Sequence, residues 1–525
     1  MPLPQIEPNL VTSPQTYRIR GQSSLIYPDQ RLTPEHCITL SNVNIGENNL
    51  ATTRSGYSEY NAAQITETAV AKALTGLFQF PFKAATRQVE MAGTKIYADD
   101  GTTRTDLTGT AQTNGAENRY RAVFMQNKMI ATNAVDVPVT WDGTVAATQI
   151  TDFTGTPFTK CEDFVVHKNV LVALNTTEGG TKMTTRARWC DVDGENFTVD
   201  VSSWPSGNRY EIYHDGAPII GGCDFNGILL IFKQDGMYPA QINADFGRLE
   251  MVILEQQAKE GLIRGVQRGF EPLAKHSIIS HPEFAWVVAR DGAYVVGPDL
   301  SLTNVIRPHL QSDWDALSKS RLQYAVSYIR QKDHQVRTLL SSTNNTSGHD
   351  KILVYDWETG DAWFDELADA PNYAATWIVN NTEYDMFGTA DGYVFTGNNG
   401  TMDNDTLINW EIKQAPNDLT LNNITKTVVK ADVIYRSLAG QRNISYEFII
   451  DQGRETSVIG TLDIAINLKW NTGLKWNTGL KWPGGTQSIK TVFINRNCTT
   501  IQPRLYGNAR ASIVGVSYHL VPLES

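Results

Sequence analysis

Histidines and acidic residues are the usual donors of metal sites and acid–base sites, and the sequence contains nine histidines and 56 aspartates and glutamates. His276 and His281 are the closest pair of histidines, and they flank the apolar segment "SIIS". Residues five apart on an extended strand point to opposite faces, so we do not expect these two to share a metal ion. The phosphate-loop, nucleophile-elbow and zinc-protease motifs GxxxxGK[ST], GxSxG and HExxH are absent from the sequence.

An acidic stretch at 191–200, "DVDGENFTVD", has the composition of a calcium-binding loop. Such loops place glycine at the sixth position and a bidentate glutamate at the twelfth. Asn196 occupies the sixth position here, and the glutamate is missing. The sequence therefore favours a polar turn, with a calcium site as the alternative.

The stretch 354–365, "VYDWETGDAWFD", is similar to the Asp-box turn of sialidase propellers, in which aspartate and glycine are two residues apart. Here Asp356 and Gly360 are four residues apart. We expect Asp356 to cap a hairpin turn, Gly360 to adopt a left-handed conformation, and Trp357 or Trp363 to pack against a sheet. A carboxylate pair for glycoside hydrolysis stays open, because its members can lie far apart in sequence.

Composition and charge limit the class of protein. The chain has 525 residues, 41% of them hydrophobic and 19% charged, which is enough for a sizeable core. A net charge of −11 argues against gripping nucleic acid through its phosphates and suits a surface that must not adhere to DNA. No signal peptide and no apolar run of 18 residues is recognisable, so we expect no membrane-spanning segment.

Five cysteines without a CxxC motif indicate neither a disulfide framework nor a zinc site, and a reducing compartment is the simpler interpretation. They are Cys37, Cys161, Cys190, Cys223 and Cys498.

The dominant pattern is an apolar run, a turn that usually contains glycine, and a second run that often opens on an aromatic residue. Clear copies lie at 227–242, 284–297, 351–364 and 384–397, and looser ones at 93–104, 127–143 and 169–194. This pattern is typical of β-hairpins. Six or seven copies, about 35 to 55 residues apart, predict an all-β fold with a six- or seven-bladed β-propeller. A β-sandwich or several small β-domains is the alternative.

We predict three segments: an N-terminal arm or platform segment at 1–60, the propeller at 61–405, and a C-terminal β-domain at 406–525. The C-terminal domain is expected to be sandwich-like and to build a β-rich platform together with the N-terminal segment. Helical signal is sparse. The stretch 312–323, "SDWDALSKSRLQ", predicts one short helix, and 255–265 predicts a second.

Near the C-terminus, residues 468–485 read "LKWNTGLKWNTGLKWPGG" and place a tryptophan at every sixth position: Trp470, Trp476 and Trp482. Because six is even, an extended chain points all three to one face, about 20 Å apart. Large aromatic residues at this spacing suit anchors in an interface with another blade, domain or subunit. Packing within the segment's own domain, a sugar-stacking platform, and three short strands broken by Asn-Thr-Gly turns are the alternatives.

The anchor hypothesis predicts that Trp476→Ala weakens assembly or stability of the protein, because truncation removes the middle anchor of the three. Sedimentation velocity and a thermal melt measure the two quantities. If neither changes, the tryptophans are not anchors.

At this point the units resemble the propeller-bearing tail hub, nozzle or DNA-stabilisation proteins of short-tailed bacteriophages. The N-terminal pattern of that family, N-V…G…L…R-x-G-Y, is matched by Asn42, Val43, Gly46, Leu50, Arg54, Gly56 and Tyr57. Its Gly-Leu…Phe and G-x-x-x-Y pattern is matched by Gly76, Leu77, Phe78, Gly93 and Tyr97. The order and spacing of the motifs over roughly residues 40–400 carry the resemblance.

Five further strand motifs of the family follow in order. They are "RARWCDVDGENFTVD" with Cys190 where serine is common, "GILLIFKQDGMY" (227–238), Asp291–Tyr294, and Leu353–Trp363 followed by Asp391–Val394. The C-terminal third resembles the family less closely, although tryptophans six apart fit it.

The resemblance implies a structural, non-enzymatic virion protein without cofactor or metal. It would form a homohexameric ring below the portal and adaptor, with N- and C-terminal segments as a docking platform. The ring would retain packaged DNA, carry fibres or spikes, and let DNA pass through its lumen without specific binding. The implied location is the virion tail, assembled in the host cytoplasm. A glycan-binding or glycan-hydrolysing propeller and an intracellular propeller scaffold are the competing hypotheses.

Overall fold

The fold is almost entirely β-structure and divides into two compact units. The computed structural model describes residues 15–23, 34–46, 50–82, 87–192, 199–212, 216–245, 248–254, 266–307, 309–345, 347–397, 400, 402–419, 425–436, 443–462 and 487–522. Unit 1 comprises Met1–Tyr57, Asp361–Ala368 and Asn398–Ser525, and unit 2 comprises Ser58–Gly360 and Asp369–Gly397. Among the helices described, none has the length and apolar character needed to span a membrane.

Seven antiparallel sheets follow one another along the described part of unit 2. The first three are β8 (Leu74–Phe80), β9 (Arg87–Ala92), β10 (Lys95–Asp99) and β11 (Arg104–Asp106); β12 (Arg121–Met125), β13 (Lys128–Thr132), β14 (Val139–Trp141) and β15 (Thr151–Asp152); and β16 (Lys160–His167), β17 (Val170–Glu178), β18 (Thr181–Trp189) and β21 (Arg209–Glu211). The fourth is β22 (Ile219–Phe225), β23 (Ile228–Lys233), β24 (Gly236–Asp245) and β25 (Arg248–Ile253), with β26 (Gln267–Arg268) beside β24.

The fifth sheet is β27 (Ile279–Ser280), β28 (Ala285–Ala289), β29 (Gly292–Val296) and β30 (Leu302–Asn304), and the sixth has β31 (Val326–Arg330), β32 (Gln335–Leu340) and β33 (Lys351–Asp356) in this unit. The seventh is β35 (Pro371–Val379), β36 (Thr382–Thr389), β37 (Val394–Gly397) and β5 (Tyr57–Asn61). Two small ribbons accompany them: β6 (Thr66–Glu67) with β7 (Val70–Ala71), and β19 (Asp191–Val192) with β20 (Val199–Asp200).

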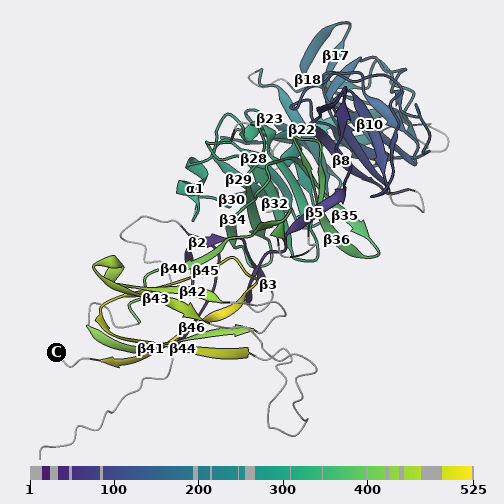
Figure 1. Ribbon diagram of the computed structural model, residues 1–525. Coiled ribbons are helices and arrows are strands. Elements are labelled where there is room, and N and C mark those ends of the chain that lie inside the picture. Colours follow the sequence, from purple (N-terminus) through teal and green to yellow (C-terminus); the bar gives the residue numbers. More distant parts are fainter. Residues whose placement is uncertain are drawn as a thin grey trace, which may run out of the picture. The chain divides into compact units, whose positions relative to one another are not determined.

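The first strands of successive sheets contact one another and close a ring. The contacts run from β8 to β12, β16, β22 and β27; the 3-10 helix η2 (Lys275–Ser277), which directly precedes β27, contacts β31; and β31 contacts β35, which returns to β8. The seventh sheet is completed by β5, a strand that precedes the first sheet in sequence. Antiparallel sheets arranged in a closed ring define a β-propeller, so the predicted fold class is confirmed (Figure 1).

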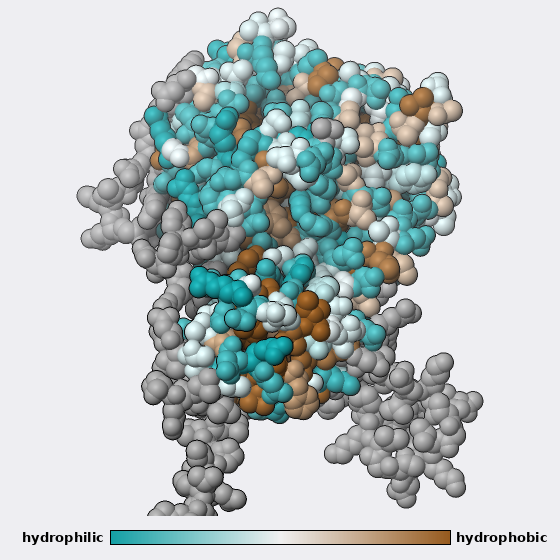
Figure 2. Space-filling view, turned by 60° about the vertical axis from the view of Figure 1, so that its left-hand side comes forward, coloured by the Kyte–Doolittle hydropathy of each residue, from teal (hydrophilic) through white to brown (hydrophobic). Residues whose placement is uncertain are grey.

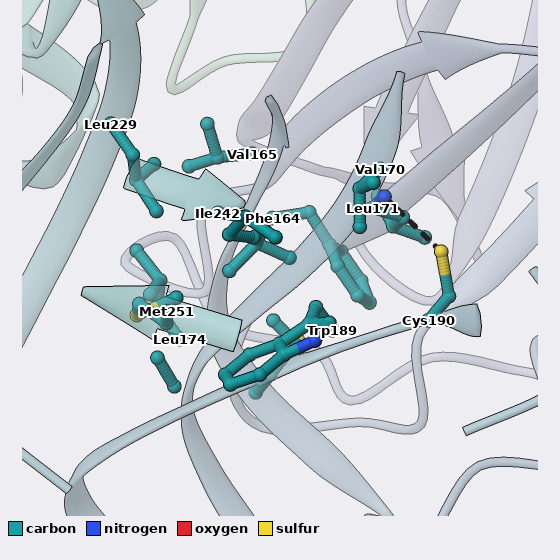
Figure 3. Packing of buried hydrophobic residues seen from close by; sticks show 14 of the residues in the cluster. Phe164, Val165, Val170, Leu171, Leu174, Trp189, Cys190, Leu229, Ile242 and Met251 are labelled. Atoms are coloured by element: carbon teal, nitrogen blue, oxygen red, sulfur yellow. Dashed lines mark hydrogen bonds between the residues drawn. The ribbon is translucent and has the colours of Figure 1, made fainter. Parts of the chain in front are cut away.

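The propeller core lies between neighbouring sheets. Between the third and fourth sheets, Phe164 and Trp189 pack with Leu229 and Ile242, and all four side chains are buried (Figure 3). On β23, Leu229 and Ile231 pack in this cluster and Leu230 and Phe232 pack in the next one, so both faces are buried and the apolar run is continuous rather than alternating.

The turn at Asp356 has the predicted conformation. Asp356 Oδ1 accepts hydrogen bonds from the backbone N–H groups of Glu358 and Thr359 at 2.9 and 3.0 Å. Gly360 has φ +75°, in the left-handed region. Trp357 packs against the rings of His281 and Phe284.

Unit 1 is a β-sandwich assembled from both ends of the chain. One sheet has the order β3 (Val43–Gly46), β4 (Leu50–Thr53), β46 (Ser512–Pro522), β41 (Lys426–Arg436) and β44 (Gln487–Cys498), with β1 (Gln15–Arg18) pairing with β46. The other has the order β2 (Cys37–Ser41), β40 (Trp410–Gln414), β45 (Ile501–Gly507), β42 (Ile444–Ile450) and β43 (Glu455–Leu462). Short strands β34 (Ala362–Glu366), β38 (Met402–Asp403) and β39 (Thr406–Leu407) also belong to this unit.

Side chains from both sheets meet in one core. The buried rings of Phe448 on β42 and Tyr518 on β46 contact each other at a centroid distance of 6.3 Å. The predicted platform, in which the N-terminal segment joins a sandwich-like C-terminal domain, is confirmed.

The helix predicted at 312–323 is wrong in extent. The helix α1 covers only Gln311–Asp315, so Ser312 lies inside it and caps nothing. The chain then turns because Trp314 and Leu317 are drawn into the core, and Leu317 forms a bridge with Ser342. Two more 3-10 helices are η3 (Leu322–Tyr324) and η4 (Asp451–Gly453). The helix predicted at 255–265 lies outside the described residues.

Candidate functional site

A hollow of about 350 Å³ opens among the first strands of the propeller sheets. Its lining comes from β8, β12, β27, β31 and β35 and from the region of η2. The lining includes Phe78, Arg121, His276, Tyr328, Tyr373 and Thr376. Because these strands belong to five different sheets, the hollow exists only when the ring is closed.

Arg121 is the cation of the hollow, and its charge is neutralised by a buried partner. Its Nε lies 2.8 Å from Oδ1 of Asp163, whose side chain is 0% exposed. Asp163 Oδ2 accepts a hydrogen bond from the backbone N–H of Gly222 at 3.0 Å. Arg121 also donates to the carbonyls of Ile278 at 3.1 Å and Lys275. The guanidinium therefore ties four consecutive segments together and has little capacity left for an anionic ligand.

His276 lines the same hollow as a neutral imidazole. Burial lowers its pKa well below the usual range, and the neighbouring cations Lys275, Arg121 and Arg119 lower the pKa further. Its ring lies edge-on to Tyr373 at 5.9 Å. Its Nδ1 is buried and has no hydrogen-bond partner among the described residues. A neutral imidazole with a strongly lowered pKa is a poor general acid at neutral pH.

A second buried cation, Arg119, stabilises the junction of the first and last sheets. Its Nη2 donates to Asn372 Oδ1 at 2.6 Å, and its Nη1 lies 3.0 Å from His349 Nε2. Asn372 in turn donates to the carbonyl of Leu74 at 2.7 Å. Burial lowers the pKa of Arg119 to about 10, so it remains charged at neutral pH.

One buried pair of carboxylates lies in the first sheet of the propeller. Arg104 contacts Glu90 through Nε at 2.6 Å and Asp99 through Nη2 at 3.0 Å, and both carboxylates are 0% exposed. Asn61 donates to both oxygens of Asp99. A glycosidase pair must face a sugar in a cleft. The carboxylates of Glu90 and Asp99 are fully buried, so we interpret them as structural.

Burial makes Glu90 a source of pH-dependent stability. Burial raises the pKa of Glu90 to about 8, and the nearby Asp99 charge adds to the increase, while Arg104 opposes it. The folded state therefore holds a proton between pH 4.5 and about 8 that the unfolded state releases. Stability from this group is present below pH 4.5 and is lost as pH rises through 8, by at most about 1.4 kcal/mol per pH unit.

We predict that Glu90→Gln removes much of this slope and leaves the protein more stable than wild type at pH 8, with little difference at pH 5. Urea denaturation at the two pH values measures it, and Glu271→Gln, at an exposed position, is the control. Equal slopes in wild type and Glu90→Gln would show that Glu90 is ionised in the fold.

The other buried histidines have structural partners. His167 Nδ1 lies 2.5 Å from Asp224 Oδ2, and its Nε2 accepts the N–H of Ile242 at 3.3 Å. His281 Nε2 lies 3.0 Å from Gln331 Oε1, away from the partners of His276. Within the part of the chain that is described, no three His, Cys, Asp or Glu side chains are grouped for a metal ion. All five cysteines are buried free thiols.

The residues predicted as interface anchors, Trp470, Trp476 and Trp482, lie outside the described residues, so that prediction stays open. Most of the calcium-like stretch, 193–198, also lies outside them.

Two features were missed by sequence reasoning. The Arg121 network and the hollow depend on residues brought together by ring closure, for which the sequence holds no signal. The exposed side chains of Ile489 and Phe493 on β44 could have been found from the sequence. They lie four residues apart and alternate with Val492 and Ile494, so both faces of the strand are apolar.

No protein family matches the sequence, and no curated protein does. Among solved structures, the Pan2 WD40 domain of Neurospora crassa aligns with 66% of this chain and 96% of its own length, at 8% identity and a TM-score of 0.38. The sheets and their closure define the class: a β-propeller protein with a β-sandwich built from both chain ends.

Proposed function

We propose that this chain is a structural tail protein of a short-tailed bacteriophage. It forms the nozzle or hub ring below the portal and adaptor, conducts and retains DNA, and supports fibres or spikes. The observation that carries the proposal is the sandwich of unit 1, in which N-terminal strands β1, β2 and β4 pair with C-terminal strands. A platform of this composition is what the resemblance to tail hub proteins implies.

Charge and the propeller interior support the same function. A chain with net charge −11 repels DNA overall, so a duplex can slide past it without being held. In the hollow, Arg121 is paired with Asp163, and His276 is neutral. These two groups of the hollow contribute to packing and ring closure, in keeping with a structural role.

The test is the mass and negative-stain image of the purified full chain, alone and mixed with a portal–adaptor complex. We expect a multiple of the 58.3 kDa chain near six copies, seen as a ring with a hole that binds the complex. A monomer that ignores the complex would overturn the proposal. Glycan arrays would then test the glycan-active propeller, and binding to host proteins would test the scaffold.

A further inference from the structure

The two sheets of unit 1 end on long strands whose outer sides have no strand neighbour among the described residues. β43 has eight residues and β44 has twelve, and each is the terminal strand of its sheet. The opposite terminal strands, β2 and β3, have five and four residues. Native proteins usually keep edge strands short or protect them, because unpaired backbone groups are a template for another strand.

The same two strands carry the three most exposed large hydrophobic side chains of the described chain. Phe493 on β44 is 70% exposed, Ile459 on β43 is 64% exposed, and Ile489 on β44 is 61% exposed. Figure 2 shows that hydrophobic residues gather on the surface of unit 1. Large apolar side chains on unpaired edges mark a surface that is covered in an assembly.

The structure around β44 fixes how its apolar side chains are presented. Val492 and Ile494 point into the sandwich and are 3% and 4% exposed, so Phe493 points outward. Beside it on the outer face, Asp432 is held by Thr491 and His519, each at 2.6 Å. Phe493 therefore stands next to a fixed polar cluster, which is the arrangement of an apolar anchor with a polar rim.

Charge distinguishes the two edges. β44 carries Lys490 and Arg496, both exposed, and no acidic residue, in a chain of net charge −11. β43 carries exposed Glu455 and no basic residue. Two copies of β44 would repel each other, whereas Glu455 on β43 can pair with Lys490 or Arg496 on β44. The occupant favoured by charge is a second copy of this chain.

We propose that β44 of one copy pairs along β43 of the next, so that Phe493 and Ile489 of one copy lie beside Ile459 of the next on the outer face of the joined sheet. Such a contact uses two different surfaces of the same chain, so it repeats head to tail and closes into a ring when the rotation between copies allows. This inference rests on the proposed function, because it supplies the contact that a nozzle ring needs.

The test uses full-length chains with one edge damaged in each: Phe493→Ser on β44 and Ile459→Ser on β43. Val70→Ser, at a 58% exposed position in unit 2, is the matched control. We expect wild type and control to assemble, and each edge variant to associate up to about fivefold more weakly, as for the loss of an apolar cross-strand pair. Both altered side chains are mostly exposed, and circular dichroism checks that the variants fold.

Mixing the two edge variants gives the sharpest outcome. The mixture holds one intact β44 and one intact β43, so we expect native mass spectrometry to show more two-chain species and fewer rings than wild type. Ile459→Ser that assembles like wild type, with Phe493→Ser impaired, would overturn head-to-tail pairing. If both variants assemble like wild type, the edges are not the contact.

Running each sample with and without the portal–adaptor complex separates this inference from the proposed function. If wild-type rings bind the complex and the edge variants do so equally well, the function stands and the edge contact is overturned. If wild type assembles through these edges and ignores the complex, the contact stands and the function fails. A wild-type chain that stays monomeric in both conditions overturns both, including the case in which another partner or the chain itself covers the edges.

Discussion

Replacing Arg121 by methionine is expected to destabilise the propeller by about 3–5 kcal/mol. The Asp163 carboxylate would lose its ion-pair partner, Arg121 on β12, while remaining fully buried. The loss should be larger at pH 8 than at pH 5. Burial already raises the pKa of Asp163 and Arg121 counteracts this, so removing Arg121 raises the pKa further. A raised carboxyl pKa stabilises the fold at low pH, and that contribution disappears as pH increases.

Urea denaturation followed by tryptophan fluorescence at pH 5 and pH 8 measures this effect. The double variant Arg121→Met with Asp163→Leu should recover much of the lost stability, because no uncompensated charge remains. Arg290→Met is the matched control: its ion pair with Glu271 is 68% and 57% exposed, so we expect less than about 1 kcal/mol. If Arg121→Met also lowers the free energy of unfolding by less than about 1 kcal/mol, water must solvate Asp163 in the variant.

Local pairing could be predicted from the sequence, because its signals lie within about 15 residues of one another. The stretches 227–242 and 284–297 form the hairpins β23–β24 and β28–β29. Their register could not be predicted. In both hairpins, the second of the two turn residues is the aspartate of the Asp-Gly pair, and the glycine is the first residue of the second strand. At Gly236, a Cβ would lie 2.1 Å from the carbonyl oxygen of Gln267, so glycine is required by the approach of β26.

Pairings that span the whole chain carry no such local signal. β5 completes a sheet whose other strands begin at Pro371, and β1 pairs with β46 near the opposite terminus. The pairing of β5 closes the ring of sheets, and the pairing of β1 extends a sheet of the sandwich. The hollow shares this limitation, since Arg121, Asp163 and His276 come from three separate segments.

The resemblance motif R-x-G-Y at Arg54, Gly56 and Tyr57 also has a physical explanation within unit 1. Arg54 donates to both oxygens of Asp403 at 2.8 and 2.5 Å and to the carbonyl of Glu366 at 2.7 Å. A Cβ on residue 56 would lie 1.9 Å from the carbonyl oxygen of Met402, so only glycine fits. The motif thus joins the N-terminal segment to the start of the C-terminal one.

Asp403→Asn is therefore expected to cost about 3–5 kcal/mol in the unfolding of unit 1. The side chains of Arg54 and Asp403 are only 4% and 3% exposed, and a guanidinium cannot shed its proton to escape burial. Asn42 would remain as a partner of Arg54 Nε at 2.8 Å, but it carries no charge. Denaturant unfolding measures the loss, and Arg54→Met completes a double-mutant cycle.

Replacing a carboxylate by its amide at a more exposed ion pair separates the effect of charge burial from the loss of a hydrogen bond. Glu411→Gln faces Arg504, and the two side chains are 26% and 35% exposed. We expect about 1 kcal/mol or less there, because water and the second carboxylate, Glu447, can take over. If both substitutions cost the same, burial of the Arg54–Asp403 pair does not determine how strongly the two ends of the chain are joined. A much larger loss for Asp403→Asn would make that pair the point at which the platform of unit 1 is held together.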